Sequence, residues 1–380
     1  MMKQVVLVTN IPTPFRVPLF NELASAMEKQ GMHLHVIFGA STYSRRMHTV
    51  DASGFRFSYT FLDASTISRR DKEKTTFLYN GLATLLNKIK PDAIIVSGFS
   101  PATLKVCMRQ IVKGTPFLVW NGSIVADFRK EGLFKNRMRK WLVSRAAGFI
   151  AYGTRAKEYL VQQGAEPDAV EIAINTVDTD FFRDETDRLR KQLPGEPVYR
   201  LLSVGYLSPR KGAIRLIDLM RVLSRRRKDI VLDIVGDGEE RAMLERRVKE
   251  YGLNDLVRFH GFVPRERLPE HMAKASVFLF HTEFDIWGLV VNEAMASGLP
   301  VICSPNAGSA RDLIKEGSTG FVRDFHHPET VADLVENLVD QTEFANRIGK
   351  DASRFITENV RLADSAQGFI SALKHLFKIR

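Results

Sequence analysis

One stretch in the second half of the chain combines a strand end, a glycine and acidic side chains at a spacing that suits anion binding. It runs from Asp285 to Gly298 and follows an apolar run, Val277–Phe280, that predicts a buried strand. Gly288 is expected to open a helix that ends at about Ser297, where Gly298 stops it. The unpaired N–H groups and the dipole at such a helix N-terminus favour an anion. The stretch therefore predicts a phosphate site at a strand end.

Two carboxylates in this stretch are candidates for binding hydroxyl groups. Glu293 is expected about five residues into the helix, where it can accept hydrogen bonds from ribose 2′- and 3′-hydroxyls. Asp285 precedes the helix and can accept hydrogen bonds from sugar hydroxyls. The alternative is that Glu293 is a solvated helix residue and Asp285 an N-cap. The apolar helix and the glycine favour the ligand role for Glu293.

A basic turn follows another predicted strand. The run Leu201–Val204 leads into Gly205, and Arg210, Lys211 and Gly212 follow in the same turn. Adjacent cations suit a diphosphate, because arginine binds phosphate through two nitrogens and lysine adds a point charge. A basic surface turn without a ligand is the alternative.

Two further glycine turns also follow predicted strands. Gly236 comes directly after the run Ile230–Val235 and resembles a nucleotide-binding turn. Phe262 follows His260 and Gly261, where a base can pack between the backbone and the aromatic ring. For each turn alone, an ordinary connection is the alternative.

The elements that must position these residues form a pattern that occurs twice. Short apolar runs alternate with longer amphipathic stretches, as do the strands and crossover helices of parallel sheets. A chain of 380 residues exceeds what one core usually serves. We therefore expect an α/β fold of two Rossmann-like, doubly wound domains, with the ligand in the cleft between them at the carboxyl ends of the strands. The runs are Val5–Val8, Leu34–Phe38, Ala93–Val96, Phe117–Val119, Phe149–Ala151, Leu201–Val204, Ile230–Val235, Val277–Phe280 and Val301–Cys303.

The domain boundary is predicted in the polar segment 183–197, which ends in proline and glycine turn signals. This gives an acceptor-binding domain over 1–185 and a nucleotide-sugar-binding domain over 186–360. Residues 361–380 are expected to form a helix that packs back on the first domain.

Together, the four motifs resemble the retaining nucleotide-sugar glycosyltransferases of family 4, which have the two-domain GT-B fold. The resemblance covers most of residues 200–325 and rests on the order, spacing and strand-end placement of the motifs. It implies that Glu293 binds the ribose. Asp285 stands where the family has a glutamate, and Tyr206 stands where the family has an arginine.

The resemblance also implies roles for the cations and for the helix start. The donor diphosphate would be neutralised by Arg210 and Lys211, together with the N–H groups at Gly288, Leu289 and Val290. No metal is then required, and no cofactor beyond the donor, a UDP- or GDP-sugar. The transition state would be oxocarbenium-like, with the acceptor attacking from the face that the diphosphate leaves.

The acceptor side is less marked in the sequence. Arg16 lies in a segment that resembles the first loop of the family, and Asn121 stands where many relatives have a histidine. Both are assigned to the acceptor side. The implied enzyme is a retaining hexosyltransferase that acts on a glycan or a lipid-linked acceptor in polysaccharide or lipopolysaccharide synthesis. A sugar-nucleotide epimerase or a phosphorylase of the same fold is the alternative.

The net charge of +11 allows nucleic acid, an anionic membrane surface or phosphorylated small molecules as partners. No nucleic-acid reader motif accompanies the basic clusters, so we expect no nucleic-acid partner. The cluster Arg129–Arg145 interleaves cations with apolar residues, which suits an anionic membrane, although a charged helix packed on its own domain explains it equally well. With two cysteines and no membrane-length apolar run, we expect a cytoplasmic protein, peripheral on the inner face of the membrane if that contact forms.

Two other patterns in the sequence contain residue types that can bind a metal ion. Asp178 and Asp180 form an Asp-x-Asp, and His33 and His35 alternate on a predicted strand. Neither pair is joined by further ligands, so we interpret the first as a turn and the second as ordinary sheet residues.

Overall fold

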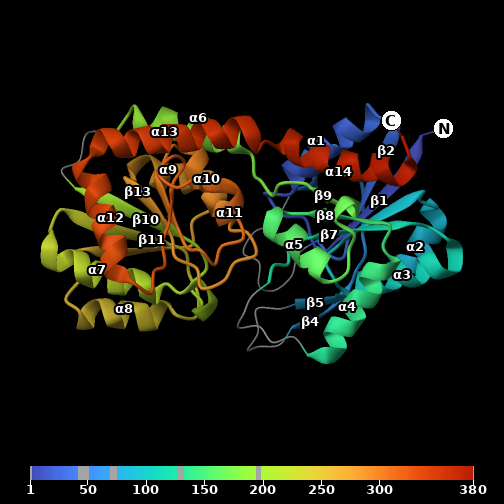
Figure 1. The fold of residues 1–380 in the computed structure, drawn as a ribbon, viewed down its shortest axis with the longest axis horizontal. Helices are drawn as coiled ribbons and strands as arrows, with labels where there is room; N and C mark the ends of the chain where they lie inside the picture. The colour runs from blue at the N-terminus through green and yellow to red at the C-terminus, as the bar shows by residue number, and fades with distance from the viewer. Residues whose placement is uncertain (1, 42–50, 69–74, 126–131, 194–197, 380) are drawn as a thin grey trace. The chain divides into compact units, whose positions relative to one another are not determined.

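The computed structural model describes residues 2–41, 51–68, 75–125, 132–193 and 198–379. The chain divides into two compact units, each built on its own parallel sheet (Figure 1). Unit 1 comprises Met1–Val177 and Leu362–Arg380, and unit 2 comprises Asp178–Arg361.

The main sheet of unit 1 has seven parallel strands in the order β3-β2-β1-β6-β7-β8-β9. They are β1 (Lys3–Thr9), β2 (Met32–Phe38), β3 (Ser58–Phe61), β6 (Ala93–Ser97), β7 (Phe117–Asn121), β8 (Gly148–Ala151) and β9 (Val170–Ile172). A separate antiparallel hairpin joins β4 (Ser65–Ser68) to β5 (Thr75–Leu78). The helices are α1 (Val17–Glu28), α2 (Leu82–Ile89), α3 (Pro101–Lys113), α4 (Leu133–Arg145), α5 (Thr154–Gln162) and α14 (Leu362–Phe377).

The core of unit 1 includes a helix from the far end of the chain. Helix α14 lies beside α1 (Figure 1) and also contacts β8 and β9. Its buried Phe369 meets Trp120 edge to face, with the ring centroids 5.1 Å apart. Gly368 permits this packing, because a Cβ there would lie 2.4 Å from the carbonyl oxygen of Ile172. The apolar face of the last helix therefore completes the first domain.

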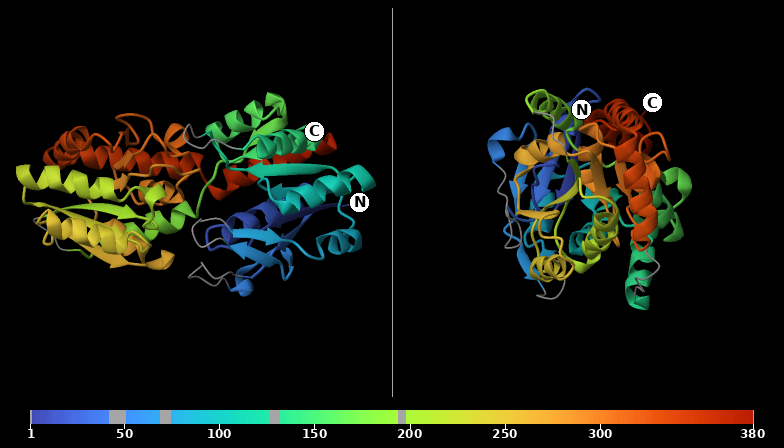
Figure 2. Two further views of the ribbon diagram at one scale, coloured as in Figure 1. Left: turned by 90° about the horizontal axis from the view of Figure 1, so that it is seen from below. Right: turned by 90° about the vertical axis from the view of Figure 1, so that its left-hand side faces the viewer.

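The sheet of unit 2 has six parallel strands in the order β12-β11-β10-β13-β14-β15. They are β10 (Tyr199–Val204), β11 (Ile230–Val235), β12 (Val257–Gly261), β13 (Val277–Phe280), β14 (Val301–Cys303) and β15 (Phe321–Val322). Helices lie on both faces of each sheet (Figure 2). Those of unit 2 are α6 (Thr179–Arg190), α7 (Ile214–Arg226), α8 (Arg241–Glu250), α9 (Leu268–Lys274), α10 (Leu289–Ala296), α11 (Ala310–Leu313), α12 (Pro328–Asp340) and α13 (Thr342–Asn359).

Every strand predicted from an apolar run is present, and each run lies within an observed strand. The strands that the runs do not mark are β3, β4, β5, β9, β12 and β15. Four of these, β3, β9, β12 and β15, lie at sheet edges. An edge strand is partly exposed and carries polar residues, so it lacks the continuous apolar run of a central parallel strand.

The predicted boundary at 185/186 is wrong, because the structure divides at Val177/Asp178. The segment predicted as a polar linker is helical as far as Arg190 and continues as a turn over residues 191–193, whereas residues 194–197 lie outside the described part of the chain. Helix α6 packs on α9 and α10, where Thr186 Oγ1 donates a hydrogen bond of 3.0 Å to Ser297 Oγ. The polar residues of α6 form its solvent-exposed face, whereas its buried face packs on other helices of unit 2.

Within the described residues, no helix is long and apolar enough to span a bilayer.

Candidate functional site

The strand order of unit 2 reverses between β10 and β13. The chain proceeds from β10 outward to β11 and β12, then returns to β13 and proceeds the other way to β14 and β15. In open parallel sheets, ligands bind outside the carboxyl ends of the strands at such a switch point. The turn Gly205–Gly212 follows β10, and the loop His281–Gly288 follows β13. Since the two strands pair with each other, the topology brings two predicted motifs to one edge of the sheet.

Lys211 and Asp285 join these two loops through an ion pair between Nζ and Oδ2. Their side chains are only 18% and 12% exposed. Burial by itself raises the pKa of Asp285, but the Lys211 ammonium and the N–H of Trp287, 3.2 Å from Oδ1, hold it below its usual value. Asp285 is therefore a carboxylate held beside a cation. It is not the N-cap of the helix, since that position belongs to Gly288.

Arg210 also joins the loop after β10 to the loop after β13. Its carbonyl oxygen accepts hydrogen bonds of 3.2 Å from the N–H groups of Glu283 and Phe284, and its Nη1 donates to the Phe284 carbonyl at 3.2 Å. Both cations of the turn thus contact the loop after β13.

Helix α10 begins where the sequence predicts. Gly288 has φ +92°, and a Cβ there would lie 2.5 Å from the ring of Phe280. Only glycine meets both demands without strain. The indole Nε1 of Trp287 donates to Asn292 Oδ1 at 3.0 Å and fastens the loop to the helix. The N–H groups of Leu289 and Val290, in the first turn, are those that a helix leaves free for an anion.

Glu293 lies in the second turn of α10 and is only 8% exposed, which contradicts a solvated helix residue. Burial raises its pKa to about 7, and Arg265 opposes this change with Nε 4.0 Å from Oε1. The Arg265 guanidinium lies over the rings of Phe181 and Phe182, at 5.1 and 4.9 Å. Its Nε and Nη2 are buried without a hydrogen-bond partner among the described residues. The sequence did not single out Arg265, although it directly follows the turn of Phe262.

The raised pKa of Glu293 predicts a pH-dependent stability. Between its ordinary value of 4.5 and about 7, the unfolded chain is ionised while the folded protein keeps its proton. The free energy of unfolding therefore falls as pH rises through this window, by about 3 kcal/mol in total for this group, and is constant above it. Urea unfolding of wild type and Glu293→Gln at pH 5 and pH 8 checks this. We expect the variant to gain stability relative to wild type at pH 8, and an equal difference at both pH values would contradict the assignment.

The other two predicted turns also come together. A Cβ on Gly236 would lie 1.9 Å from the carbonyl oxygen of Gly205, so the two loops touch through bare backbone. The N–H of Gly236 donates to the Gly261 carbonyl at 2.7 Å, which links the turn to the one that carries Phe262. The Phe262 side chain is 46% exposed, so its ring is free to pack against a planar ligand.

The two residues assigned to the acceptor side both lie in unit 1. Arg16 ends the loop after β1, and Asn121 is the last residue of β7. Both are buried, with 9% and 1% exposure. The structure places them at the carboxyl edge of their own sheet.

The patterns that we did not interpret as metal sites have local partners. The Asp178 carboxylate caps α6 by accepting from the Phe181 N–H at 3.2 Å. His33 and His35 form hydrogen bonds with Ser58 and Thr60 of the neighbouring strand, at 3.1 and 2.9 Å.

Part of the chain is similar in sequence to known glycosyltransferases. A sequence profile of the family "Glycosyl transferases group 1" matches residues 184–355. The chain is 34% identical to a GDP-mannose-dependent alpha-(1-6)-phosphatidylinositol monomannoside mannosyltransferase of Mycobacterium tuberculosis, over 49% of this chain and 50% of that protein. It is 27% identical to the alpha-D-kanosaminyltransferase of Streptomyces kanamyceticus, over 56% of each chain. The matches thus span about half the length of these relatives.

A solved structure is similar over nearly the whole chain. Anabaena HepE, determined in complex with UDP and glucose, superposes with a TM-score of 0.74 at 17% identity, covering 98% of this chain and 99% of that one. The predicted fold class, two Rossmann-like α/β domains of the GT-B type, is confirmed.

Proposed function

We propose that this protein is a glycosyltransferase that transfers a hexose-type sugar from a UDP- or GDP-sugar to a glycan or lipid-linked acceptor, with retention at the anomeric carbon. The match of residues 184–355 to the group 1 glycosyl transferases supports this proposal. The observation that carries the proposal is the junction of the loops after β10 and β13. It sets Lys211 beside Asp285 at the edge of the sheet from which helix α10 starts.

The residues of unit 2 have distinct tasks in this proposal. Arg210, Lys211 and the N–H groups at the start of α10 stabilise the negative charge that grows on the leaving diphosphate. Asp285 holds Lys211 in place and accepts hydrogen bonds from the donor sugar. Glu293, ionised, accepts hydrogen bonds from the ribose hydroxyls, and Gly236 and Phe262 border the base. These protein groups suffice for charge neutralisation, so we propose that transfer needs no metal.

A panel of nucleotides tests this function through the melting temperature. We expect UDP, GDP or one of their sugars to raise the melting temperature by about 5–10 °C at a hundredfold excess over Kd, equally with Mg²⁺ and with EDTA. ADP serves as the comparison nucleotide. If no nucleoside diphosphate stabilises the protein, the proposed function fails, and if EDTA removes the shift, metal independence fails.

The retained alternative is a different reaction on the same fold. An epimerase would convert the donor without an acceptor, and a phosphorylase would require inorganic phosphate. Product analysis with the stabilising donor separates these cases from transfer. Synthesis of polysaccharide or lipopolysaccharide is the setting that we propose, since a lipid-linked acceptor is among the substrates considered.

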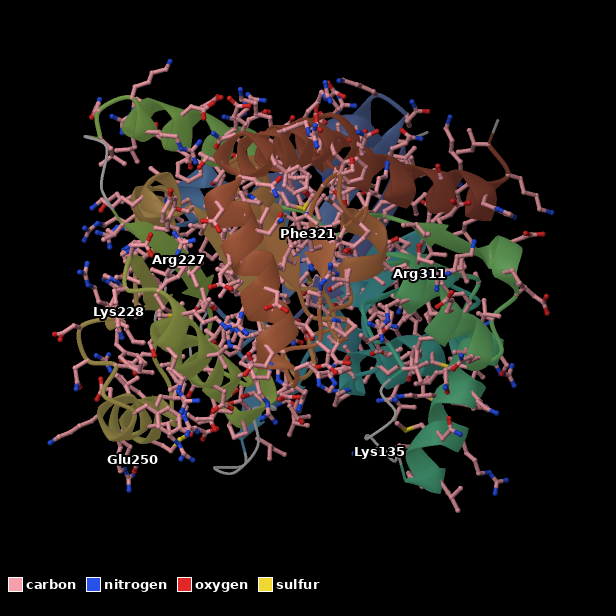
Figure 3. All side chains as sticks on the ribbon, turned by 60° about the vertical axis from the view of Figure 1, so that its left-hand side comes forward. Lys135, Arg227, Lys228, Glu250, Arg311 and Phe321 are labelled. Atoms are coloured by element: carbon pink, nitrogen blue, oxygen red, sulfur yellow. The ribbon has the colours of Figure 1, made fainter. Side chains whose placement is uncertain are left out.

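Membrane contact is proposed from the start of α4. Leu133 and Phe134 are 84% and 80% exposed, whereas Leu142 and Val143, at the other end, are buried on unit 1. The helix also carries Lys135 (Figure 3) and further cations: Arg137, Arg139, Lys140 and Arg145. Arg129 and Lys130 of the predicted cluster lie outside the described residues. The helix is therefore packed at one end and offers an apolar, basic tip at the other.

With this contact we propose a peripheral location on the inner face of the cytoplasmic membrane. Sedimentation with phosphatidylglycerol vesicles tests the contact itself. We expect binding that weakens with salt, and a loss of about tenfold or more in Leu133→Ala/Phe134→Ala, because apolar burial and lipid charge both contribute. Val112→Ala, an exposed apolar residue of α3, is the control and should bind as wild type does. Equal binding of both variants would argue against a membrane role for α4.

A further inference from the structure

Arg16 is a buried cation held by aromatic rings in unit 1. Its guanidinium carbon lies 4.4 Å from the ring centroid of Trp120, 5.0 Å from that of Tyr152 and 5.5 Å from that of Phe15. The side chain is 9% exposed. Stacking on aromatic faces fixes the guanidinium plane, so its N–H groups have defined directions.

A buried arginine is normally paired with a carboxylate, but no carboxylate among the described residues forms an ion pair with Arg16. Burial lowers the pKa of Arg16, and the opposing influence comes from Tyr152. Its Nη1 is buried without a hydrogen-bond partner among the residues that the structure describes. An uncompensated buried charge is destabilising, so it requires an explanation beyond packing.

Three neighbouring side chains also have a polar atom for which the described residues provide no hydrogen-bond partner. Trp120 Nε1, Asn121 Nδ2 and Thr13 Oγ1 are also buried without partners in the described part of the chain. Arginine and indole nitrogens can only donate hydrogen bonds, and a hydroxyl can do so as well. What this group of side chains lacks is therefore an acceptor.

The backbone brings these side chains together at the carboxyl edge of the sheet of unit 1. They come from the loop after β1 and from the end of β7, and Tyr152 directly follows β8. The Asn121 carbonyl accepts from the Tyr152 N–H at 3.1 Å. Gly122 leaves room for that ring, since a Cβ there would lie 2.3 Å from it. The carboxyl edge of a parallel sheet is where such folds bind ligands.

We propose that this cluster, Thr13, Arg16, Trp120 and Asn121, is a subsite for an anionic group of the acceptor, a carboxylate or a phosphate on the sugar that receives the transferred residue. The proposal rests on the proposed function, which it makes specific to acidic acceptors. A guanidinium matches two oxygens of either group, and the surrounding N–H and O–H donors complete their coordination.

Binding of matched acidic and neutral sugars to the full-length protein tests the subsite. The pairs are glucuronic acid with glucose, galacturonic acid with galactose, and glucose 6-phosphate with glucose, titrated calorimetrically with the stabilising nucleotide present. We expect at least one acidic member to bind tenfold or more tightly than its neutral counterpart. The uronic acids and the sugar phosphate separate the two possible anions. No acidic preference in any pair would overturn the proposal.

Variants of Arg16 assign the preference to this residue. Arg16→Gln should abolish the preference, and Arg16→Lys, which keeps the charge but not the planar fork, should retain only part of it. Arg56→Gln, an exposed arginine of the same unit, should behave as wild type. If Arg16→Gln still binds the acidic sugar more tightly than the neutral one, the proposed subsite is wrong.

The nucleotide melting shift separates this proposal from the function itself. In Arg16→Gln and Arg16→Lys we expect that shift to equal the wild-type shift. A smaller shift in these variants would place Arg16 in donor binding and overturn the acceptor assignment. The absence of any shift in wild type would instead remove the proposed function.

Discussion

Replacing Lys211 with methionine should lower kcat for sugar transfer by about 10²–10³-fold, the usual cost of removing one preorganised charge-stabilising group. We expect this because of where Lys211 lies. It extends from the loop after β10 to Asp285 on the loop after β13, the place where we propose that the diphosphate departs from the sugar. Steady-state kinetics with the donor identified by the melting panel gives the measurement. The matched control is Lys228→Met, an exposed lysine on the surface of unit 2 (Figure 3), which should retain wild-type activity.

The same substitution leaves the Asp285 carboxylate buried without its cation, so instability must be distinguished from lost catalysis. Breaking one side of a buried ion pair costs about 3–5 kcal/mol, whereas removing both charges is often close to neutral. The double variant Lys211→Met/Asp285→Asn should therefore recover most of the lost stability and none of the activity. Recovery of activity together with stability would show that Lys211 has only a structural role.

Replacing Glu293 with glutamine should weaken nucleotide binding by about 10–100-fold, because hydrogen bonds to a charged acceptor contribute about 1.5–3 kcal/mol. Glutamine is the informative substitution because it keeps the side-chain shape and one acceptor for Arg265, whose Nε lies 4.0 Å from Oε1. Both substitutions remove the charge, but alanine would also remove this acceptor and leave a cavity, which would confuse binding with folding.

A nucleotide without ribose hydroxyls identifies the contact. Wild type should bind the 2′,3′-dideoxy form of its nucleoside diphosphate much more weakly than the ordinary form, and Glu293→Gln should bind both about equally. The control is Glu250→Gln, an exposed glutamate at the end of α8 (Figure 3), which should keep the wild-type difference. A glutamine variant that still discriminates as wild type does would show that Glu293 does not hold the ribose.

The sequence was sufficient for the parts of the fold and site that depend on local chemistry. Buried parallel strands such as Val277–Phe280 are continuous apolar runs, so composition alone marks them. Gly288 and Gly298 have φ of +92° and +71°, and glycine is the residue that adopts such values freely. These two glycines therefore mark the start and the end of α10 in the sequence. The resemblance to a known family added the expected roles of Glu293 and Lys211.

The boundary between the units could not be predicted in the same way. Residues 183–190 are polar in sequence because one face of α6 is solvated, and only its packing on α9 and α10 shows that it belongs to unit 2. A count of polar residues cannot distinguish a linker from the outer face of a helix, since both contact water.

Contacts between residues far apart in the chain were decided by the tertiary structure alone. Burial raises the pKa of Glu293 to about 7, and the residue that opposes this change, Arg265, comes from a different loop. The aromatic rings around Arg16 come from β7 and from the residue after β8. The sequence determined which side chains are available and where the buried strands and helix α10 lie. Which charges lose their water, and which remain without a partner, depends on how non-adjacent strands order themselves in the sheet, and that order sets the desolvation on which the proposed chemistry relies.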